Sequence, residues 1–269
     1  MVVQHNLRAV NSNRMLGLTS STQSKSTEKL SSGYKINRAA DDAAGLAISE
    51  KMRRQVRGLT QASINAQDGV SLVQTAEGAL NEVHDMLQRM NELAVKAANG
   101  TNQTEDRNYI DKEVKALKTE IDRVADTTTF NEQNLLKADT TFELQVGADA
   151  KQTIDVSVKA MGTKGLKIND VTVSDASSAQ TAITTIKSAI KILNEQRADL
   201  GAQQNRLEHT IANLDNVVEN TTAAESRIRD TDMATEMVKY SNNNILAQAG
   251  QAMLAQSNQA NQGVLSLLQ

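Results

Sequence analysis

Apolar residues recur at alternating spacings of four and three along most of the chain, the pattern of a coiled-coil seam. In the first half the seam positions are Ile48, Met52, Gln55, Leu59, Ala62, Ala66, Gly69, Val73, Ala76, Leu80, Val83, Leu87, Met90, Ala94 and Ala97. They predict a single helix about 75 Å long at ~1.5 Å per residue. Because many of these positions are Ala or Gly, we expect a neighbouring helix to approach closely.

A second seam of nearly equal length follows in the other half of the chain. Its positions are Ile183, Ile186, Ile190, Leu193, Arg197, Leu200, Gln204, Leu207, Ile211, Leu214, Val218, Thr221, Glu225 and Ile228. Two helices of matched length predict an antiparallel rod. A shorter helix, capped by Thr104, is predicted between them from the spacing of Ile110, Val114, Leu117, Ile121 and Val124.

The middle of the chain changes to strict alternation, which predicts strands. Phe142, Leu144 and Val146 form one run, Ile154, Val156 and Val158 form the next, and Val171 and Val173 follow as a short strand or loop. The predicted fold is therefore mainly α, a long antiparallel coiled-coil-like helical rod with terminal helices and a small β-hairpin region near 140–175. We expect the hairpin at the tip of the rod.

Both ends of the chain continue the helical spacing with weaker residues. The C-terminal positions are Met233, Met237, Tyr240, Asn244, Ala247, Gln251, Leu254, Asn258, Asn261, Leu265 and Leu268, and the N-terminal positions are Val3, Leu7, Val10, Arg14 and Gly17. Polar seam residues cost stability, and helices without a firm packing face are marginal in water. The ends are therefore expected to fold against partner copies.

The composition narrows the chemistry. The chain has no Cys, Pro or Trp and a net charge of -3, which excludes disulfides and cysteine-bound metals and favours long helices. Ten basic and four acidic residues fall within positions 1–60, so this segment carries +6 and the rest -9. Lys51, Arg53, Arg54 and Arg57 lack neighbouring aromatic residues for base stacking, so they indicate a subunit contact or solvated face rather than nucleic-acid binding.

No constellation of catalytic or metal-binding residues is visible. His5, His84 and His209 are scattered, and Asp41-Asp42 is best explained as a helix cap. We predict no catalytic residue, no cofactor, no metal and no enzyme activity. No apolar run approaches the roughly 20 residues that cross a bilayer, and the N-terminus lacks a signal-peptide pattern, so these rules alone would place the protein in the cytoplasm.

Two blocks of sequence carry a specific family resemblance. Leu30-Ser31-Ser32-Gly33-Tyr34-Lys35-Ile36-Asn37, followed by 39–45 (AADDAAG), resembles the N-terminal signature of bacterial flagellins. The segments 226–228 (SRI), 234–236 (ATE), 248–250 (QAG), 254–256 (LAQ) and 264–268 (VLSLL) resemble the C-terminal signature. The resemblance covers residues 1 to about 138 and about 176 to 269.

The resemblance implies a structural subunit that self-assembles into the flagellar filament, with little of the family's variable central region. It implies an N-terminal D0 helix and linker (1–40), N-terminal D1 helices (41–138), a short β segment (139–175), a C-terminal D1 helix (176–230) and a C-terminal D0 helix (231–269). It also implies an extracellular location, reached through the flagellar export apparatus with a secretion chaperone and without a cleaved signal peptide. Further implied partners are the filament cap and hook-associated proteins, but neither nucleic acid nor a membrane.

The resemblance further implies two sets of contact residues. Host Toll-like receptor 5 would contact Gln88, Arg89, Glu92, Leu93 and Glu113. Filament assembly and chaperone binding would use Val3, Leu7, Val10, Ile245, Leu246, Met253, Leu254, Val264, Leu265, Leu267 and Leu268. Judged by spacing alone, Arg89 would instead form an ordinary ion pair with Glu92 or Asp85.

The sequence leaves two alternative hypotheses for the function of the whole chain. A hook-filament junction protein would share the terminal helices but need no long-range self-stacking. A coiled-coil signalling module would form a stable dimer with apolar seams, which the polar residues at 244, 251, 258 and 261 disfavour.

Overall fold

The computed structural model describes residues 6–266, with side chains up to residue 260, and its fold is mainly helical. Its contacts form two compact units. Residues 55–219 form the rod unit, and residues 1–54 together with 220–269 form the terminal unit. The predicted boundaries near 40 and 231 fall at breaks in the helices, whereas the compact units divide farther along α2 (Ala43–Ala98) and α4 (Ala176–Arg229).

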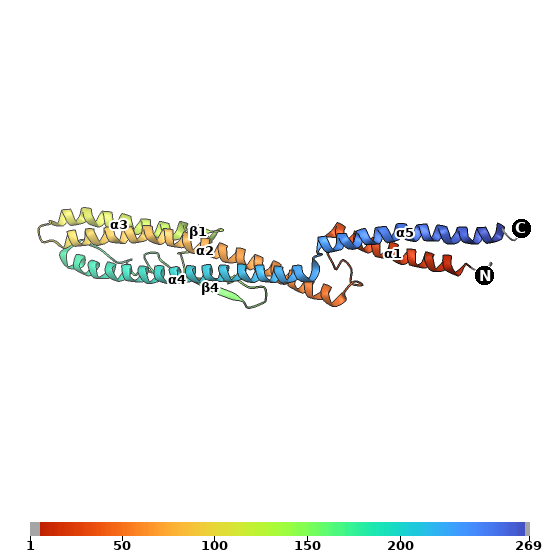
Figure 1. The fold of residues 1–269 in the computed structure, drawn as a ribbon. Helices are drawn as coiled ribbons and strands as arrows, with labels where there is room; N and C mark the ends of the chain where they lie inside the picture. The colour runs from red at the N-terminus through yellow and green to blue at the C-terminus, as the bar shows by residue number, and fades with distance from the viewer. Residues whose placement is uncertain (1–5, 267–269) are drawn as a thin grey trace. The chain divides into compact units, whose positions relative to one another are not determined.

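The rod unit is built on the predicted antiparallel pair of long helices. α2 and α4 lie side by side, with the shorter α3 (Thr104–Thr127) beside α2 (Figure 1). The direction of the pair is shown by a hydrogen bond from Ser63 Oγ to Asp215 Oδ1, 3.0 Å long, and by an ion pair of 3.6 Å between Arg197 and Glu77. The pairing inferred from matched seam lengths is therefore confirmed.

The predicted seam of α2 is buried along most of its length. Every predicted seam position from Leu59 to Ala97 is buried, and most of the larger side chains among them are fully buried. The seam does not extend as far towards the N-terminus as predicted, because Ile48 is 47% exposed and Gln55 is also exposed.

Between residues 182 and 197 the α4 seam is shifted by one residue at every second position. Leu193 and Leu200 are buried as predicted, but Ala189 and Gln196 are buried where Ile190 and Arg197 were expected. The physical reason is that α4 packs against the β segment as well as α2. Gln196, 1% exposed, donates a hydrogen bond of 3.1 Å to the Ser157 carbonyl of the hairpin.

The central hairpin forms as the alternation predicts. β3 (Thr140–Gln145) pairs with β4 (Thr153–Val158) in antiparallel register, placing Phe142 opposite Val156 and Leu144 opposite Ile154. One face of this two-stranded sheet packs on the core, while Glu143 and Asp155 face solvent. The turn between the strands spans 146–152.

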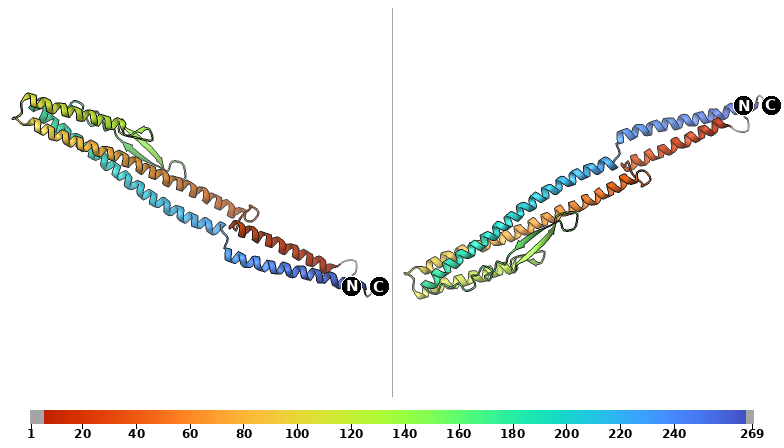
Figure 2. Two further views of the ribbon diagram at one scale, coloured as in Figure 1. Left: turned by 90° about the horizontal axis from the view of Figure 1, so that it is seen from above. Right: turned by 90° about the horizontal axis from the view of Figure 1, so that it is seen from below.

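The hairpin lies along the side of the rod unit, not at its tip (Figure 2). It runs beside α2, where a Cβ added at Gly58 would lie 2.9 Å from Ala148 Cβ and one added at Gly69 would clash with Leu144 Cδ1. Asn65 of α2 also donates a hydrogen bond to the Gln145 carbonyl. The expectation of a tip was wrong because two α2 glycines provide room for the hairpin alongside the helix.

Two local elements differ from the prediction. α3 begins at Thr104, so the N-cap is Gln103, whose backbone N–H donates to Asp106 Oδ2, and Thr104 is the first helical residue. A small hairpin, β1 (Thr129–Phe130) with β2 (Gln133–Asn134), was not foreseen. Its two turn residues, Asn131 and Glu132, both have positive φ, as a tight hairpin turn requires.

The segment from 159 to 175 contributes side chains to the core without becoming a strand. Val171 and Val173 are core residues, as expected from their alternation, but they lie in irregular backbone. Polar side chains of α3 hold this segment in place. Asp122 accepts hydrogen bonds of 2.8 Å from both the N–H and the hydroxyl of Thr163, and Lys118 donates to the Val171 carbonyl.

The terminal unit contains α1 (Leu7–Ser32) and α5 (Met233–Ser266), which pack against each other along their length (Figures 1 and 2). α1 ends at Gly33, whose left-handed conformation (φ 77°) lets its N–H bond to the Lys29 carbonyl. None of the helices within the described part of the chain is long and apolar enough to span a membrane.

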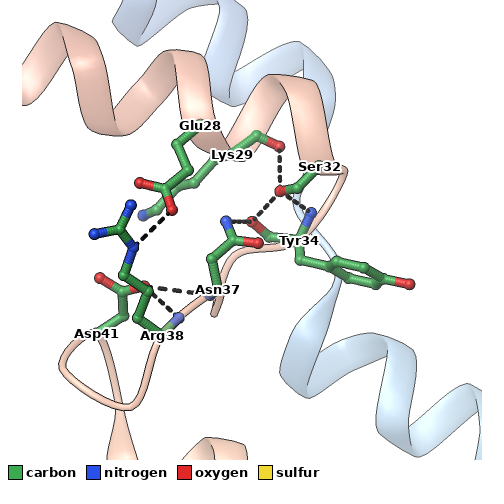
Figure 3. Close-up of polar contacts among 7 residues, drawn as sticks. All are labelled: Glu28, Lys29, Ser32, Tyr34, Asn37, Arg38 and Asp41. Carbon is green, nitrogen blue, oxygen red and sulfur yellow. Dashed lines mark hydrogen bonds and ion pairs between the residues drawn. The ribbon is translucent and has the colours of Figure 1, made fainter.

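The linker between α1 and α2 is folded by its own polar groups (Figure 3). Asp41 accepts hydrogen bonds from the backbone N–H groups of Asn37 and Arg38, and the Arg38 guanidinium pairs with Glu28 at 3.0 Å. Asp42 Oδ1 accepts from the N–H of Gly45 in the first turn of α2. The helix-capping role expected for the Asp41-Asp42 pair is therefore confirmed for Asp42, whereas Asp41 bonds within the linker.

Candidate functional site

The terminal helix pair is polar on its inside. The α1 side chains that turn towards α5 are small or polar for the most part, and comprise Ala9, Ser12, Leu16, Thr19, Gln23 and Ser26. Their counterparts on α5 are Glu236, Tyr240, Asn243, Ala247, Gly250, Leu254 and Ser257. Because so little apolar area is removed from water between them, this pairing supplies little hydrophobic stabilisation.

The larger apolar side chains of both helices point away from the pair. We call this set the outward face: Leu7, Val10, Met15, Leu18, Met233, Met237, Val238, Ile245, Leu246 and Met253, with exposures of 47–73%. On α5 these residues lie on both sides of the inward row, since a helix with 3.6 residues per turn places Met237 on one side of Glu236 and Leu246 on the other. A single partner helix could not cover all of them, so the outward face needs contacts on more than one side.

The terminal seams therefore differ from the prediction. Leu7, Val10 and Met237 were expected inside and are exposed, whereas Glu236 was not expected inside and is 7% exposed. The predicted pattern assumed that apolar residues mark the inside of a helix pair. Here they mark the outside, and small residues such as Gly250, which packs against Leu16, allow the helices to approach.

Glu236 is the buried charge of this pair, and its partners come from both helices. Ser26 Oγ of α1 donates a hydrogen bond of 2.7 Å to Glu236 Oε1, and Lys239 pairs with Oε2 at 3.4 Å. The Ser26 hydrogen bond is the main cause that lowers the pKa of Glu236, and the charges of Lys239 and Lys29 add to it despite the opposing effect of burial. The ionised carboxylate therefore ties α5 to α1.

The predicted assembly residues divide into three groups. Leu7, Val10, Ile245, Leu246 and Met253 belong to the outward face, while Leu254 turns towards α1. Val264 and Leu265 lie in α5, but their side chains are outside the described residues, as are Val3, Leu267 and Leu268 altogether. Met15, Leu18 and Val238 were missed. Counting apolar residues around each helix, instead of along one seam, would have found them.

The two units carry opposite net charge. The terminal unit holds 12 basic and 8 acidic side chains, a net +4, and the rod unit holds 17 basic and 24 acidic, a net -7. Opposite charge on different parts of one subunit favours association between copies.

A second exposed surface joins α2 and α3 in the rod unit. The Arg89 guanidinium pairs with Glu113 of α3 at 2.9 Å and with Glu92 of its own helix at 3.2 Å. The Glu113 hydrogen bond is the main cause that raises the pKa of Arg89. The ion pair that spacing alone predicts is therefore confirmed for Glu92, the i+3 partner, and Glu113 of the neighbouring helix is a second partner.

The surroundings of Arg89 only partly match the predicted contact set. Gln88, Arg89, Glu92 and Glu113 are exposed. The amide nitrogen of Gln88 lies 2.7 Å from the ring nitrogen Nε2 of His84. Leu93 is 3% exposed and belongs to the core, so its side chain is not available at this surface. The reason is that α2 is flanked by two helices, which bury the position before seam residue Ala94 as well.

Within residues 6–266, no group of three or more His, Cys, Asp or Glu side chains is arranged to hold a metal ion. The two units instead expose two surfaces. The terminal unit exposes the apolar outward face of a weakly packed helix pair, and the rod unit exposes the charged cluster around Arg89. Exposed apolar patches of this kind mark sites of protein–protein interaction.

Comparison with known proteins identifies the family. Residues 3–141 match the bacterial flagellin N-terminal helical region, and residues 183–268 match the bacterial flagellin C-terminal helical region. These two matches cover most of the chain and leave only the central β segment and its flanks between them. The chain belongs to the bacterial flagellin family, a family of structural proteins.

Full-length relatives agree with this assignment. The chain is 55% identical to a flagellin of Halalkalibacterium halodurans and 49% identical to the flagellar filament 31.3 kDa core protein of Treponema maltophilum, and in each case the alignment covers 100% of both chains. A solved structure described as a flagellar hook-associated protein from Vibrio parahaemolyticus shares the fold, with a TM-score of 0.60, 13% identity and coverage of 71% of this chain and 100% of that one.

Proposed function

We propose that this protein is the structural subunit of a bacterial flagellar filament, and that it assembles outside the cell by packing the outward face of α1 and α5 against other copies. The filament serves motility. The single observation that carries the proposal is the inverted helix pair, whose inside holds Ser26 and Glu236 while its outside holds Leu7, Leu18 and Ile245. Burial of these exposed side chains between copies would provide the hydrophobic stabilisation that the isolated pair lacks.

The proposal is tested by seeded assembly. The purified chain is mixed with short filament seeds or with ammonium sulfate, and elongation is followed by sedimentation and electron microscopy. We expect the variant Leu7→Ser/Leu18→Ser/Ile245→Ser to stay monomeric with an unchanged far-UV circular dichroism spectrum. The control Asn13→Ser, at another exposed position of α1, should elongate normally. Normal elongation of the triple variant would contradict the proposal.

The same experiment separates the filament subunit from a hook-filament junction protein. A junction protein occupies one layer and has no need to stack on itself, so the pure chain would not elongate. The relatives that align over the full chain are a flagellin and a filament core protein, which favours the filament subunit.

The proposal includes the route of export. An unassembled subunit needs its outward face covered in the cytoplasm, and a secretion chaperone bound to α5 would do so before the chain passes through the flagellar export apparatus. The filament cap and hook-associated proteins would then meet the same helices at the growing end. Export of wild-type and Ile245→Ser/Leu246→Ser chains, compared in culture supernatants, tests this, since weaker chaperone binding should reduce the exported amount.

We further propose that the α2–α3 surface is recognised by Toll-like receptor 5 of a host. The supporting observation is the exposed Arg89 guanidinium fixed between Glu113 and Glu92, because a preorganised Arg is a frequent anchor of protein interfaces. Arg89→Ala should weaken binding of the receptor ectodomain by at least about tenfold, which corresponds to ~1.4 kcal/mol. Arg123→Ala, which removes an exposed i,i+3 ion pair elsewhere on α3, serves as control and should bind normally.

A further inference from the structure

Methionine is unevenly distributed over the structure. Of the nine methionines in the chain, Met15, Met233, Met237 and Met253 lie on the outward face with exposures of 47–59%. In the rod unit, Met90 and Met161 are fully buried and Met86 is half-buried. The exposed thioethers among the described residues are therefore concentrated on the surface that we assign to contact between copies.

The composition makes these thioethers the readiest targets for an oxidant. The chain has no cysteine and no tryptophan, so no thiol or indole competes for a peroxide. In the reaction, the methionine sulfur attacks one oxygen of hydrogen peroxide, the O–O bond breaks and an S–O bond forms. The sulfur loses two electrons, the peroxide is reduced, and the departing oxygen leaves as water after proton transfer.

We propose that Met15, Met233, Met237 and Met253 form an oxidative modification site, at which a peroxide converts the unassembled subunit to a methionine sulfoxide form that cannot join the filament. This inference rests on the proposed filament function. Each sulfoxide places a strongly polar S–O group on the outward face, where assembly would have to bury it.

The fold of the subunit itself tolerates the modification. The four side chains face solvent, and none of them belongs to the inward row of the helix pair, which on α5 includes Glu236 and Tyr240. Oxidation therefore changes the surface and leaves the α1–α5 contacts in place. The buried Met90 and Met161 are protected by the rod core, so the rod unit keeps its packing.

Assembly state determines when the site can react. In a free subunit the four sulfurs are open to a dissolved peroxide. In a filament they would be covered by neighbouring copies, and they should react more slowly than in the free chain. The site consequently selects against damaged subunits before they are built in, while leaving existing filaments intact.

The experiment compares three chains before and after treatment with hydrogen peroxide. These are the wild type, the variant Met15→Leu/Met233→Leu/Met237→Leu/Met253→Leu, and the control Met52→Leu/Met86→Leu, which keeps the four exposed sulfurs and replaces two half-buried ones. Sulfoxide is located by peptide mass spectrometry, and elongation is measured from untreated seeds. Leu replaces Met with little change in volume or hydrophobicity.

We expect peroxide to slow elongation of the wild type and the control by at least about tenfold, because polar groups without partners are costly to bury, and to leave the fourfold variant unaffected. Wild-type chains that carry all four sulfoxides and still elongate normally would overturn the inference. Failure of the untreated wild type to elongate would count instead against the filament function itself.

Two further readouts keep the inference testable if the fourfold variant assembles poorly. In a peroxide titration of the wild type, elongation must fall in step with sulfoxide at the four exposed sites and not with sulfoxide at Met52 or Met86. When intact filaments are oxidised, the four sites must react more slowly than in free subunits. Equal rates would show that the sulfurs are not covered by neighbouring copies, and would overturn the inference.

Discussion

The α2–α4 pair of the rod unit and the α1–α5 pair of the terminal unit use the same helical spacing to bury opposite kinds of side chain. The first pair buries Leu87 and Leu193 completely, and the second buries Ser26 and Glu236 while Leu18 stays exposed. Since burial of apolar area is the dominant stabilising contribution to folding, the rod unit can be stable in an isolated chain. The terminal pair leaves its apolar area exposed, and the contacts between copies that we propose would bury it.

Truncation of one leucine in each pair should reveal the largest difference between them. Leu87→Ala removes a fully buried side chain and should lower the free energy of unfolding of the rod unit by about 2–5 kcal/mol. Leu18→Ala, at an exposed position of α1, should change it by less than about 0.5 kcal/mol. Chemical denaturation followed by circular dichroism measures both. A large loss from Leu18→Ala would mean that the terminal pair hides a core of its own.

A pair of α2 glycines tests how tightly the rod is packed. Gly69→Ala would press a methyl group into Leu144 of β3 and should destabilise the rod unit by about 1–3 kcal/mol through overpacking. Gly78→Ala meets no atom within 4 Å and should stabilise it by about 0.5–1 kcal/mol, because alanine favours a helix over glycine. Thermal unfolding of the two variants compares them. Equal shifts would show that the hairpin does not pack on α2.

A partly buried polar contact of the rod unit should contribute more to stability than an exposed ion pair. Asp122→Ala leaves the Thr163 hydroxyl and N–H without their acceptor in a partly buried place and should cost about 1–2 kcal/mol. Asp126→Ala breaks only an exposed ion pair with Lys137, for which the expected loss is below about 0.5 kcal/mol. Hydrogen exchange of the 159–175 backbone should increase in Asp122→Ala alone. No change in exchange would remove Asp122 as the anchor of that segment.

The apolar pattern predicted burial less well where a helix contacts more than one neighbouring element. The α2 seam from Leu59 to Ala97 was predictable because that face meets a broad apolar interface. The same template missed Leu93, which is buried by a second neighbour, and Gln196, which is buried by the hairpin. A seam predicted from spacing assumes that each helix has one partner helix. Most helices of this protein have more than one neighbouring element.

The terminal unit shows a different limit. The family signature and the assembly residues Leu7, Val10 and Ile245 were found from the sequence, but Leu7 and Val10 were also placed on the inward seam, and they are exposed. Apolar residues indicate that a face will be buried, without showing whether the partner belongs to the same chain or to another copy. The turn at Asn131 and Glu132 was missed for a local reason, because Glu132 stands where the usual Asn-Gly turn has its glycine.

Glu236 is a buried charge among the described side chains of the terminal pair, and its removal should have a small effect. The folded state lowers the pKa of Glu236 through the Ser26 hydrogen bond and the charges of Lys239 and Lys29. A lowered pKa means that the carboxylate stabilises the pair at pH values above the unfolded pKa of about 4.3, and that this contribution is lost as pH falls through the lower folded pKa. Glu236→Gln keeps a hydrogen-bond acceptor for Ser26 and removes the charge, so at neutral pH it should cost no more than about 1 kcal/mol.

In the wild type, amide signals of α5 followed by NMR should lose their folded positions on acidification below about pH 4, whereas in Glu236→Gln the residual helix should respond much less to pH. Glu28→Gln, which removes an exposed partner of Arg38 in the same unit, should retain the wild-type acid response. If both variants respond to acid as the wild type does, the terminal pair is held together by contacts other than its buried carboxylate, and its difference from the rod is then one of hydrophobic content alone.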